Sequence, residues 1–163
     1  MLSIISPAKS QDFDSPIPYP LATECRYIKE AKQLVSILKK HTAEDISALM
    51  KVSEKIAELN RGRYAHWKTP FPKDMARAAI FAFTGEVYNG LQAYNWSQAD
   101  LKQSQKQLRI LSGLYGILRP TDLILPYRLE MGTKLANKKG KDLYAFWGEA
   151  LTKQLRIDLE ESG

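Results

Sequence analysis

Apolar residues recur at intervals of three and four along most of the chain, which is the spacing of one face of an α-helix. The clearest series contains Tyr27, Ala31, Leu34, Val35 and Leu38. The same periodicity predicts helices over residues 22–40, 42–50, 53–62, 97–111 and 143–159, and a helix or turn at 87–91. The side chains expected to cap the first four of these helices at their N-termini are Thr23, Thr42, Ser53 and Ser97.

Two short apolar runs lack this periodicity and predict buried strands, Leu2–Ile5 and Ile80–Phe83. A Pro-rich loop at 8–20 follows the first run, and a short helix at 76–79 is expected to lead into the second. Helices outnumber strands, so we expect a mixed α/β fold, rich in helix with few strands. Because two buried strands have few visible partners, residues 1–163 are expected to form a single domain, truncated relative to a longer fold.

The segment 108–132 has the most unusual pattern, because two glycines interrupt the predicted helix at Gly113 and Gly116. Glycine reaches positive φ at little cost, so the backbone can turn tightly there. We expect a motif like a helix-hairpin-helix, in which exposed amides of this corner bind phosphate oxygens and arginines beside it add charge. The alternative is a helix C-cap at Gly113 followed by a Pro-terminated loop that packs on the core.

Positive charge accumulates in the same half of the chain. The net charge is +6, and between Lys102 and Lys141 only Asp122 and Glu130 oppose the basic residues. This block favours a polyanionic partner, although a solvated lysine face is the simpler reading. We expect binding to the DNA backbone without sequence preference, on duplex or branched DNA. The predicted nucleic-acid-binding residues are Lys9, Lys106, Arg109, Gly113, Leu114, Tyr115, Gly116, Arg119, Arg128 and Lys134.

The alternative is an enzyme that acts on a nucleotide or another anionic small molecule, in a cleft lined by Lys9, Arg119, Arg128 and Glu130. The sequence contains no G-x-S-x-G motif, no Walker lysine and no His or Cys cluster of metal-binding spacing. We therefore expect a binding protein rather than an enzyme, with no catalytic residue, cofactor or metal. The carboxylates that could serve as oxygen ligands for iron have a spacing that matches no known metal-binding loop; they are Asp12, Asp14 and Glu24.

A cytoplasmic location is expected from three features of the sequence. Cys25 is the single cysteine and cannot form an internal disulfide. The N-terminus lacks the basic and apolar regions of a secretory signal, and no apolar run is long enough to span a membrane. Cys25 itself is expected to be an inert, partly packed thiol, and the oligomeric state stays open.

Four blocks of the chain resemble the YaaA family of bacterial peroxide stress proteins. They read MLSIISPAK (1–9), FTGEVYNGL (83–91), LSGLYGILRPTDLILPYRLEMGTKL (111–135) and DLYAFWG (142–148). The resemblance extends along the whole chain, in order, and matches roughly the N-terminal two-thirds of family members. It implies a single mixed α/β domain with a positively charged cleft and a helix-hairpin-helix type motif. It also implies DNA binding, protection against hydrogen peroxide and restraint of free intracellular iron.

Overall fold

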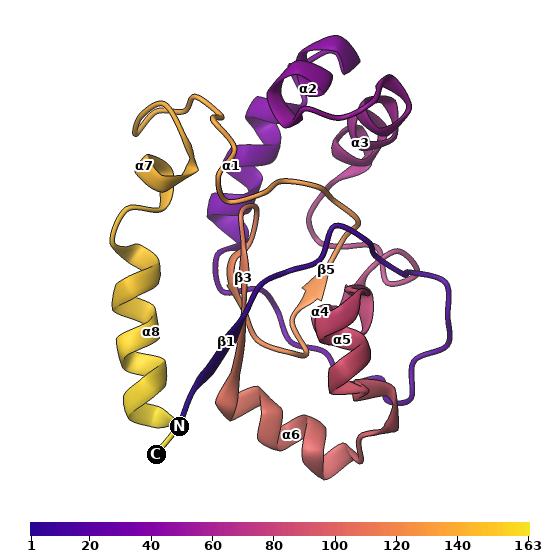
Figure 1. Cartoon of the computed structure of the whole chain (residues 1–163), viewed down its shortest axis with the longest axis vertical. Coiled ribbons are helices and arrows are strands. Elements are labelled where there is room, and N and C mark those ends of the chain that lie inside the picture. Colours follow the sequence, from indigo (N-terminus) through magenta and orange to yellow (C-terminus); the bar gives the residue numbers. More distant parts are fainter.

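The computed structural model describes all residues from Met1 to Gly163 and shows a mixed α/β fold with two small sheets (Figure 1). The larger sheet has the strand order β1-β3-β4, and the smaller sheet pairs β2 with β5. Strand β1 runs parallel to β3, and β3 runs antiparallel to β4. The strands are β1 (Ser3–Ile5), β2 (Arg77–Ala78), β3 (Leu108–Ser112), β4 (Gly116–Leu118) and β5 (Leu123–Ile124). The helix-rich fold class with few strands is therefore confirmed.

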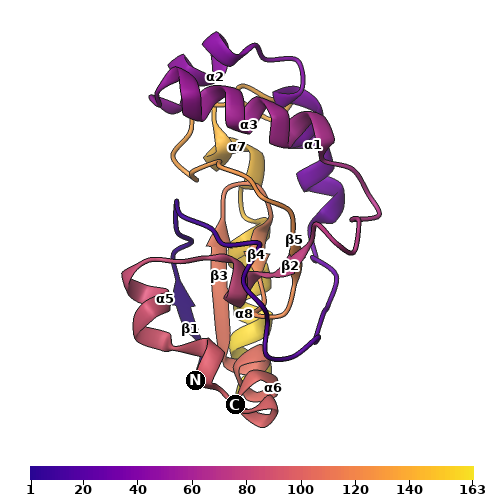
Figure 2. The ribbon, with the colours of Figure 1, turned by 90° about the vertical axis from the view of Figure 1, so that its right-hand side faces the viewer.

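Helices surround both sheets: α1 (Ile28–Leu38), α2 (Ala43–Met50), α3 (Glu54–His66), α4 (Ala79–Ala82), α5 (Glu86–Leu91), the 3-10 helix η1 (Ala93–Asn95), α6 (Gln98–Gln107), α7 (Leu143–Trp147) and α8 (Ala150–Glu161). The two views place α2 and α3 at one end of the molecule and α6 at the other, near both termini (Figure 1, Figure 2). Strand β3 follows α6 directly, and β1 is parallel to it. Both strands therefore point away from the end that carries α6.

Three of the four predicted N-caps are confirmed. Thr42 and Asp45 form a reciprocal capping box at the start of α2, and Ser97 forms one with Asp100 at the start of α6. The hydroxyl of Ser53 accepts a hydrogen bond from the amide of Ile56 at 3.3 Å. These caps join residues three apart in sequence, so local chemistry is enough to predict them.

The fourth predicted cap is wrong, because α1 begins at Ile28 rather than beside Thr23. The Thr23 hydroxyl donates to Asp122 at 2.6 Å, and its backbone amide donates to Thr121 at 2.9 Å. These long-range partners hold Thr23 in an extended bridge beside the second sheet. Helix α3 also differs from its predicted range, since it continues to His66 through Gly62.

The predicted helix at 97–111 is wrong over its last residues, 108–111. Helix α6 ends at Gln107, and residues 108–112 form β3, which pairs with β1 on one side and β4 on the other. The glycine corner therefore joins two strands of a β-hairpin, with Ser112 opposite Gly116, and is not a helix-hairpin-helix. Gly116 has a φ of 72°, which suits glycine at the turn. Pairing with β1, which is distant in sequence, and with the neighbouring β4 overrides the local helical spacing here.

The apolar run before residue 84 is also assigned differently. Strand β2 lies where a short helix was predicted at 76–79, and most of the predicted strand Ile80–Phe83 belongs to helix α4. A short apolar run can be a buried helix as easily as a buried strand, which explains the error. The predicted strand at the N-terminus is confirmed as β1, but β1 is a sheet edge rather than a buried strand, and Ile4 is 48% exposed.

Aromatic side chains occupy the centre of the core. Tyr115 is fully buried, and its hydroxyl accepts a hydrogen bond from the Trp67 indole at 3.0 Å. Its ring packs edge-on against Tyr127, with ring centroids 5.1 Å apart. Burial raises the pKa of the Tyr115 phenol well above its ordinary value, so the group stays neutral. Among the helices, none combines the length and the apolar character that crossing a membrane requires.

Candidate anion-binding site

The glycine corner lies inside the protein. Leu114 and Tyr115 are both 0% exposed, and Gly113 and Gly116 are also buried. The amide of Tyr115 donates to the Ser112 hydroxyl at 3.0 Å, and the carbonyl of Gly113 accepts from the Trp147 indole at 3.0 Å. The two apolar side chains between the glycines pack into the core and draw the turn inward. The turn at Leu114 and Tyr115 is therefore closed to a phosphate group in solvent, and of the corner only Gly113 borders a surface hollow.

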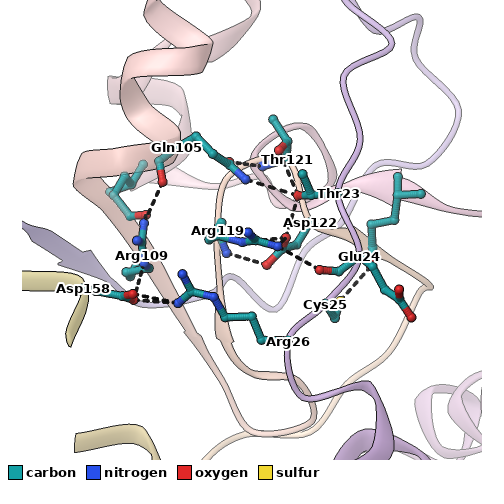
Figure 3. A network of polar contacts seen from close by, with 12 residues as sticks. Thr23, Glu24, Cys25, Arg26, Gln105, Arg109, Arg119, Thr121, Asp122 and Asp158 are labelled. Carbon is teal, nitrogen blue, oxygen red and sulfur yellow. Dashed lines mark hydrogen bonds and ion pairs between the residues drawn. The ribbon is translucent and has the colours of Figure 1, made fainter. Parts of the chain in front are cut away.

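Arg109 is buried and fully engaged, with a side chain that is 3% exposed. Its Nε donates to a carboxylate oxygen of Asp158 at 2.6 Å, and its Nη1 donates to the carbonyl of Gln105 at 2.9 Å. Arg26 contacts the same carboxylate from the other side at 2.7 Å (Figure 3). This cluster fastens α8 to β3 and to the segment before α1, and Arg109 acts there as a structural residue.

The electrostatics of Asp158 follow from these contacts. Burial alone raises the pKa of this carboxyl, because a charge is costly in an environment of low polarity. Hydrogen bonds from Arg109, Arg26 and Gln154 outweigh burial and lower the pKa from 3.8 to about 2. Asp158 therefore stays ionised at neutral pH, and its negative charge balances the positive charges of Arg109 and Arg26.

Arg119 belongs to a second internal cluster. Its guanidinium contacts the fully buried carboxylate of Asp122 at 2.8 Å and donates to the carbonyl of Glu24 at 2.9 Å. Asp122 also accepts from the Thr23 hydroxyl, and Thr121 lies in the same network through Gln105 (Figure 3). Arg119 thus ties the loop after β4 to the segment before α1. The structure separates it from the other residues of the predicted cleft.

Lys9, Arg128 and Glu130, by contrast, meet at the surface. One carboxylate oxygen of Glu130 lies 3.4 Å from Lys9 Nζ and 3.7 Å from Arg128 Nη2. The side chains of Lys9 and Glu130 are 66% and 55% exposed, whereas that of Arg128 is 20% exposed. Three of the four residues predicted for a small-molecule cleft are therefore adjacent.

The backbone around this triad is firmly held. The side-chain amide of Gln11 donates to the carbonyl of Tyr127 at 2.8 Å and accepts from its amide at 3.2 Å. The hydroxyl of the buried Tyr64 donates to the carbonyl of Arg128. Helix α3 and the loop after β1 consequently fix the segment that carries Arg128 and Glu130.

Two adjoining hollows share Arg128 and Glu130. The smaller has a volume of about 340 Å³ and lies between the loop after β1 and residues 127–131. The larger has a volume of about 870 Å³ and lies between residues 40–51, at and beside α2, and residues 128–134. The charged side chains that line one or both hollows are Lys9, Lys40, Asp45, Lys51, Arg128, Glu130 and Lys134. Five cations thus stand against two carboxylates.

The predicted nucleic-acid-binding residues fall into three groups according to their position relative to the hollows. Lys9, Arg128 and Lys134 line the hollows, and the buried Gly113 borders the smaller one. Lys106 is exposed on α6, at the opposite end of β3 from this region. The buried or internally paired group comprises Arg109, Leu114, Tyr115, Gly116 and Arg119.

Sequence reasoning missed the contribution of α2 to this site. Lys40 and Lys51 stand before and after the helix, and they join the larger hollow only because α2 lies beside residues 128–134. Lys51 adopts a left-handed backbone with a φ of 54° as the helix C-cap. No local motif in the sequence marks either lysine as a partner of Arg128.

The thiol of Cys25 and the carboxylate of Asp12, the other candidate reactive or ligating groups, have structural roles in packing and in a turn. The thiol of Cys25 is buried and donates to the carbonyl of Leu123 at 2.9 Å, and burial raises its pKa. One carboxylate oxygen of Asp12 accepts from the amides of Asp14 and Ser15, which closes a turn. No three side chains of His, Cys, Asp or Glu gather closely enough to hold a metal ion.

The fold and the site define a mixed α/β protein whose surface carries two joined hollows lined by more cations than carboxylates. The chain belongs to the YaaA family, since the model described as "Peroxide stress protein YaaA" matches residues 1–162.

Curated relatives are similar over the whole chain. A UPF0246 protein of Laribacter hongkongensis is 53% identical over 164 residues, and one of Hahella chejuensis is 50% identical over 163 residues. A UPF0246 protein of Shewanella baltica is likewise 50% identical over 163 residues. Each match covers 100% of this chain and 63% or 64% of the relative. The chain therefore spans less than two-thirds of the length of these relatives.

Proposed function

We propose that this YaaA-family chain binds DNA through the phosphate backbone as part of the response to peroxide stress. One observation carries the proposal: Lys9, Arg128 and Lys134 converge on two joined hollows, and Lys40 and Lys51 add to them. An excess of cations around a concave surface attracts and retains polyanions. We name the two joined hollows, with their lining residues, the basic cleft.

The cations of the basic cleft can exchange partners, whereas the internal arginines cannot. Lys9 and Arg128 contact Glu130 at 3.4 and 3.7 Å, and the side chains of Lys9 and Glu130 are largely exposed whereas that of Arg128 is partly buried. Ion pairs of this kind contribute about 0 to 1 kcal/mol, so a phosphate can replace the carboxylate. Arg109 and Arg119 hold buried carboxylates at 2.6 and 2.8 Å, and removing them from these partners would be far more costly.

Binding of this kind is independent of base sequence. The basic cleft offers lysine and arginine side chains to phosphate oxygens, and contacts to phosphate carry no information about the base sequence. The ligand under this proposal is duplex or branched DNA, since both present such a backbone. Protein bound along the backbone would shield the DNA from iron-driven oxidation without holding iron itself.

The test compares two charge-matched double variants on one duplex over a salt series. Lys9→Ala/Arg128→Ala removes two contacts of the basic cleft, and Lys102→Ala/Lys106→Ala removes two exposed lysines of α6. We expect the log–log salt slope of the cleft variant to fall by about 0.9 per lost phosphate contact, with the α6 variant near wild type. Equal losses in both variants, or an unchanged slope in the cleft variant, would contradict the proposal.

An enzyme acting on an anionic small molecule is the second candidate, because the smaller hollow encloses about 340 Å³ beside Lys9 and Arg128. Arg119 takes no part in it, since its guanidinium is held by Asp122. A screen of nucleotides and acyl phosphates tests this candidate. Turnover that disappears in Arg128→Ala while DNA binding persists would favour it over a binding module.

A further inference from the structure

Glu130 is a carboxylate of an unusual kind in this protein. Its oxygen lies between Lys9 Nζ and Arg128 Nη2 at 3.4 and 3.7 Å, and the side chain forms no hydrogen bond. It is 55% exposed and lines both hollows. Asp122 and Asp158 differ in every respect, because both are fully buried and each accepts several short hydrogen bonds.

The position of Glu130 coincides with the place where an incoming anion has to lie. A phosphate that contacts Lys9 and Arg128 together must bring an oxygen between their charged groups, where the Glu130 oxygen now lies. The carboxylate is also held loosely, since both ion pairs are long, and the exposed pair with Lys9 contributes little and is screened by salt. Its side chain can swing into solvent while the backbone stays fixed by Gln11 and Tyr64.

We propose that Glu130 is an internal competitor that determines which anions the basic cleft accepts; this inference rests on the proposed function of that cleft. The carboxylate neutralises Lys9 and Arg128 when the site is empty, and a ligand binds only by displacing it. A small monovalent ion replaces one carboxylate with one equal charge and gains little. A strand of phosphodiesters adds contacts to Lys134 and to the lysines beside α2, which offset the loss of the Glu130 pairs.

Removing the charge of Glu130 should increase the affinity of the basic cleft for DNA. Glu130→Gln keeps the shape of the side chain and abolishes its charge. We expect it to tighten binding of a 20-base-pair duplex by roughly three- to tenfold, which corresponds to the loss of two long, weak ion pairs. The matched control is Glu149→Gln at the N-cap of α8, where the carboxylate forms an exposed ion pair with Lys153 at 3.3 Å outside the cleft. That control should leave the affinity within twofold.

A double-mutant cycle separates direct competition from a general effect of charge. In the Lys9→Ala/Arg128→Ala background, Glu130→Gln should no longer exceed the effect of Glu149→Gln, since its partners are gone. Tightening that persists in this background would overturn the proposal in favour of long-range electrostatics. Weaker binding of Glu130→Gln would overturn it as well, because Glu130 would then orient Arg128 for the ligand.

The failure of this inference and the failure of the proposed function give different results. If the cleft does not bind DNA, Lys9→Ala/Arg128→Ala alone leaves the affinity unchanged. If the cleft binds DNA but Glu130 does not compete, that double variant weakens binding while Glu130→Gln has no effect. Circular dichroism of each variant verifies the fold, and all four substituted side chains lie at the surface or at the edge of a hollow.

Discussion

At the residue scale, three arginines that look alike in the sequence have different tasks. Arg109 and Arg119 hold buried carboxylates, and only Arg128 borders a hollow. The sequence could predict that all three are important, because each stands among apolar residues in the block 108–132. It could not predict their partners, since Asp158 lies 49 residues beyond Arg109 and is brought to it by the docking of α8.

The Asp158 cluster leads to a prediction about stability and pH. Asp158→Asn leaves Arg109 buried without its counter-charge, so we expect the free energy of unfolding at neutral pH to fall by about 3 to 5 kcal/mol. The pKa of Asp158 is lowered from 3.8 to about 2, so its contribution is present above the ordinary value and is lost as the pH falls through that interval. Urea titrations from neutral to acid pH measure both effects.

The comparison for this prediction is Glu149→Gln, an exposed carboxylate at the N-cap of the same helix whose loss should change stability by less than about 0.5 kcal/mol. Wild-type protein should lose stability steeply as the pH falls from 3.8 towards 2, and Asp158→Asn should lose less over that range. Equal acid sensitivity of the two proteins would show that Asp158 does not provide the stabilisation.

At the element scale, the elements that the sequence predicts correctly are those whose hydrogen-bonding partners lie close by in the chain. The helices capped by Thr42, Ser53 and Ser97 were predictable, because each cap bonds an amide three residues ahead. Strand β3 was not, because one of its two partners, β1, lies about a hundred residues earlier in the chain. The hairpin corner was recognised as a tight turn, but its burial depends on Leu114 and Tyr115 packing against distant elements.

The hairpin offers a prediction at this scale. A Cβ added at Gly113 would overlap the carbonyl oxygen of Leu129, a backbone atom that cannot move aside easily. We expect Gly113→Ala to destabilise the protein by about 1 to 3 kcal/mol or more, as overpacking does in rigid interiors. Thermal unfolding followed by circular dichroism measures the change.

Gly62→Ala is the matched control for the hairpin prediction. Gly62 lies inside α3, and nothing is within 4 Å of the position that its Cβ would take. Alanine is the better helix former, so this variant should be more stable than wild type by about 0.5 to 1 kcal/mol. A Gly113→Ala protein as stable as wild type would show that the hairpin can shift away from residues 129–131.

At the scale of the whole molecule, the basic cleft is assembled from three separate stretches of the chain. Lys9 follows β1, Lys40 and Lys51 flank α2, and Arg128 and Lys134 follow β5. Lys9, Arg128 and Lys134 were predictable, because they lie within the blocks that resemble the family. The two lysines beside α2 were out of reach, since only the tertiary arrangement brings α2 to residues 128–134 (Figure 2).

The most direct measurement is hydrogen exchange of the backbone amides with and without a saturating DNA duplex. The account predicts slower exchange in residues 6–11, 40–51 and 128–134, which border the basic cleft, and unchanged exchange in α6. Protection that appears on α6 or elsewhere on the surface, with no change around Lys9 and Arg128, would contradict the central claim that DNA occupies this cleft.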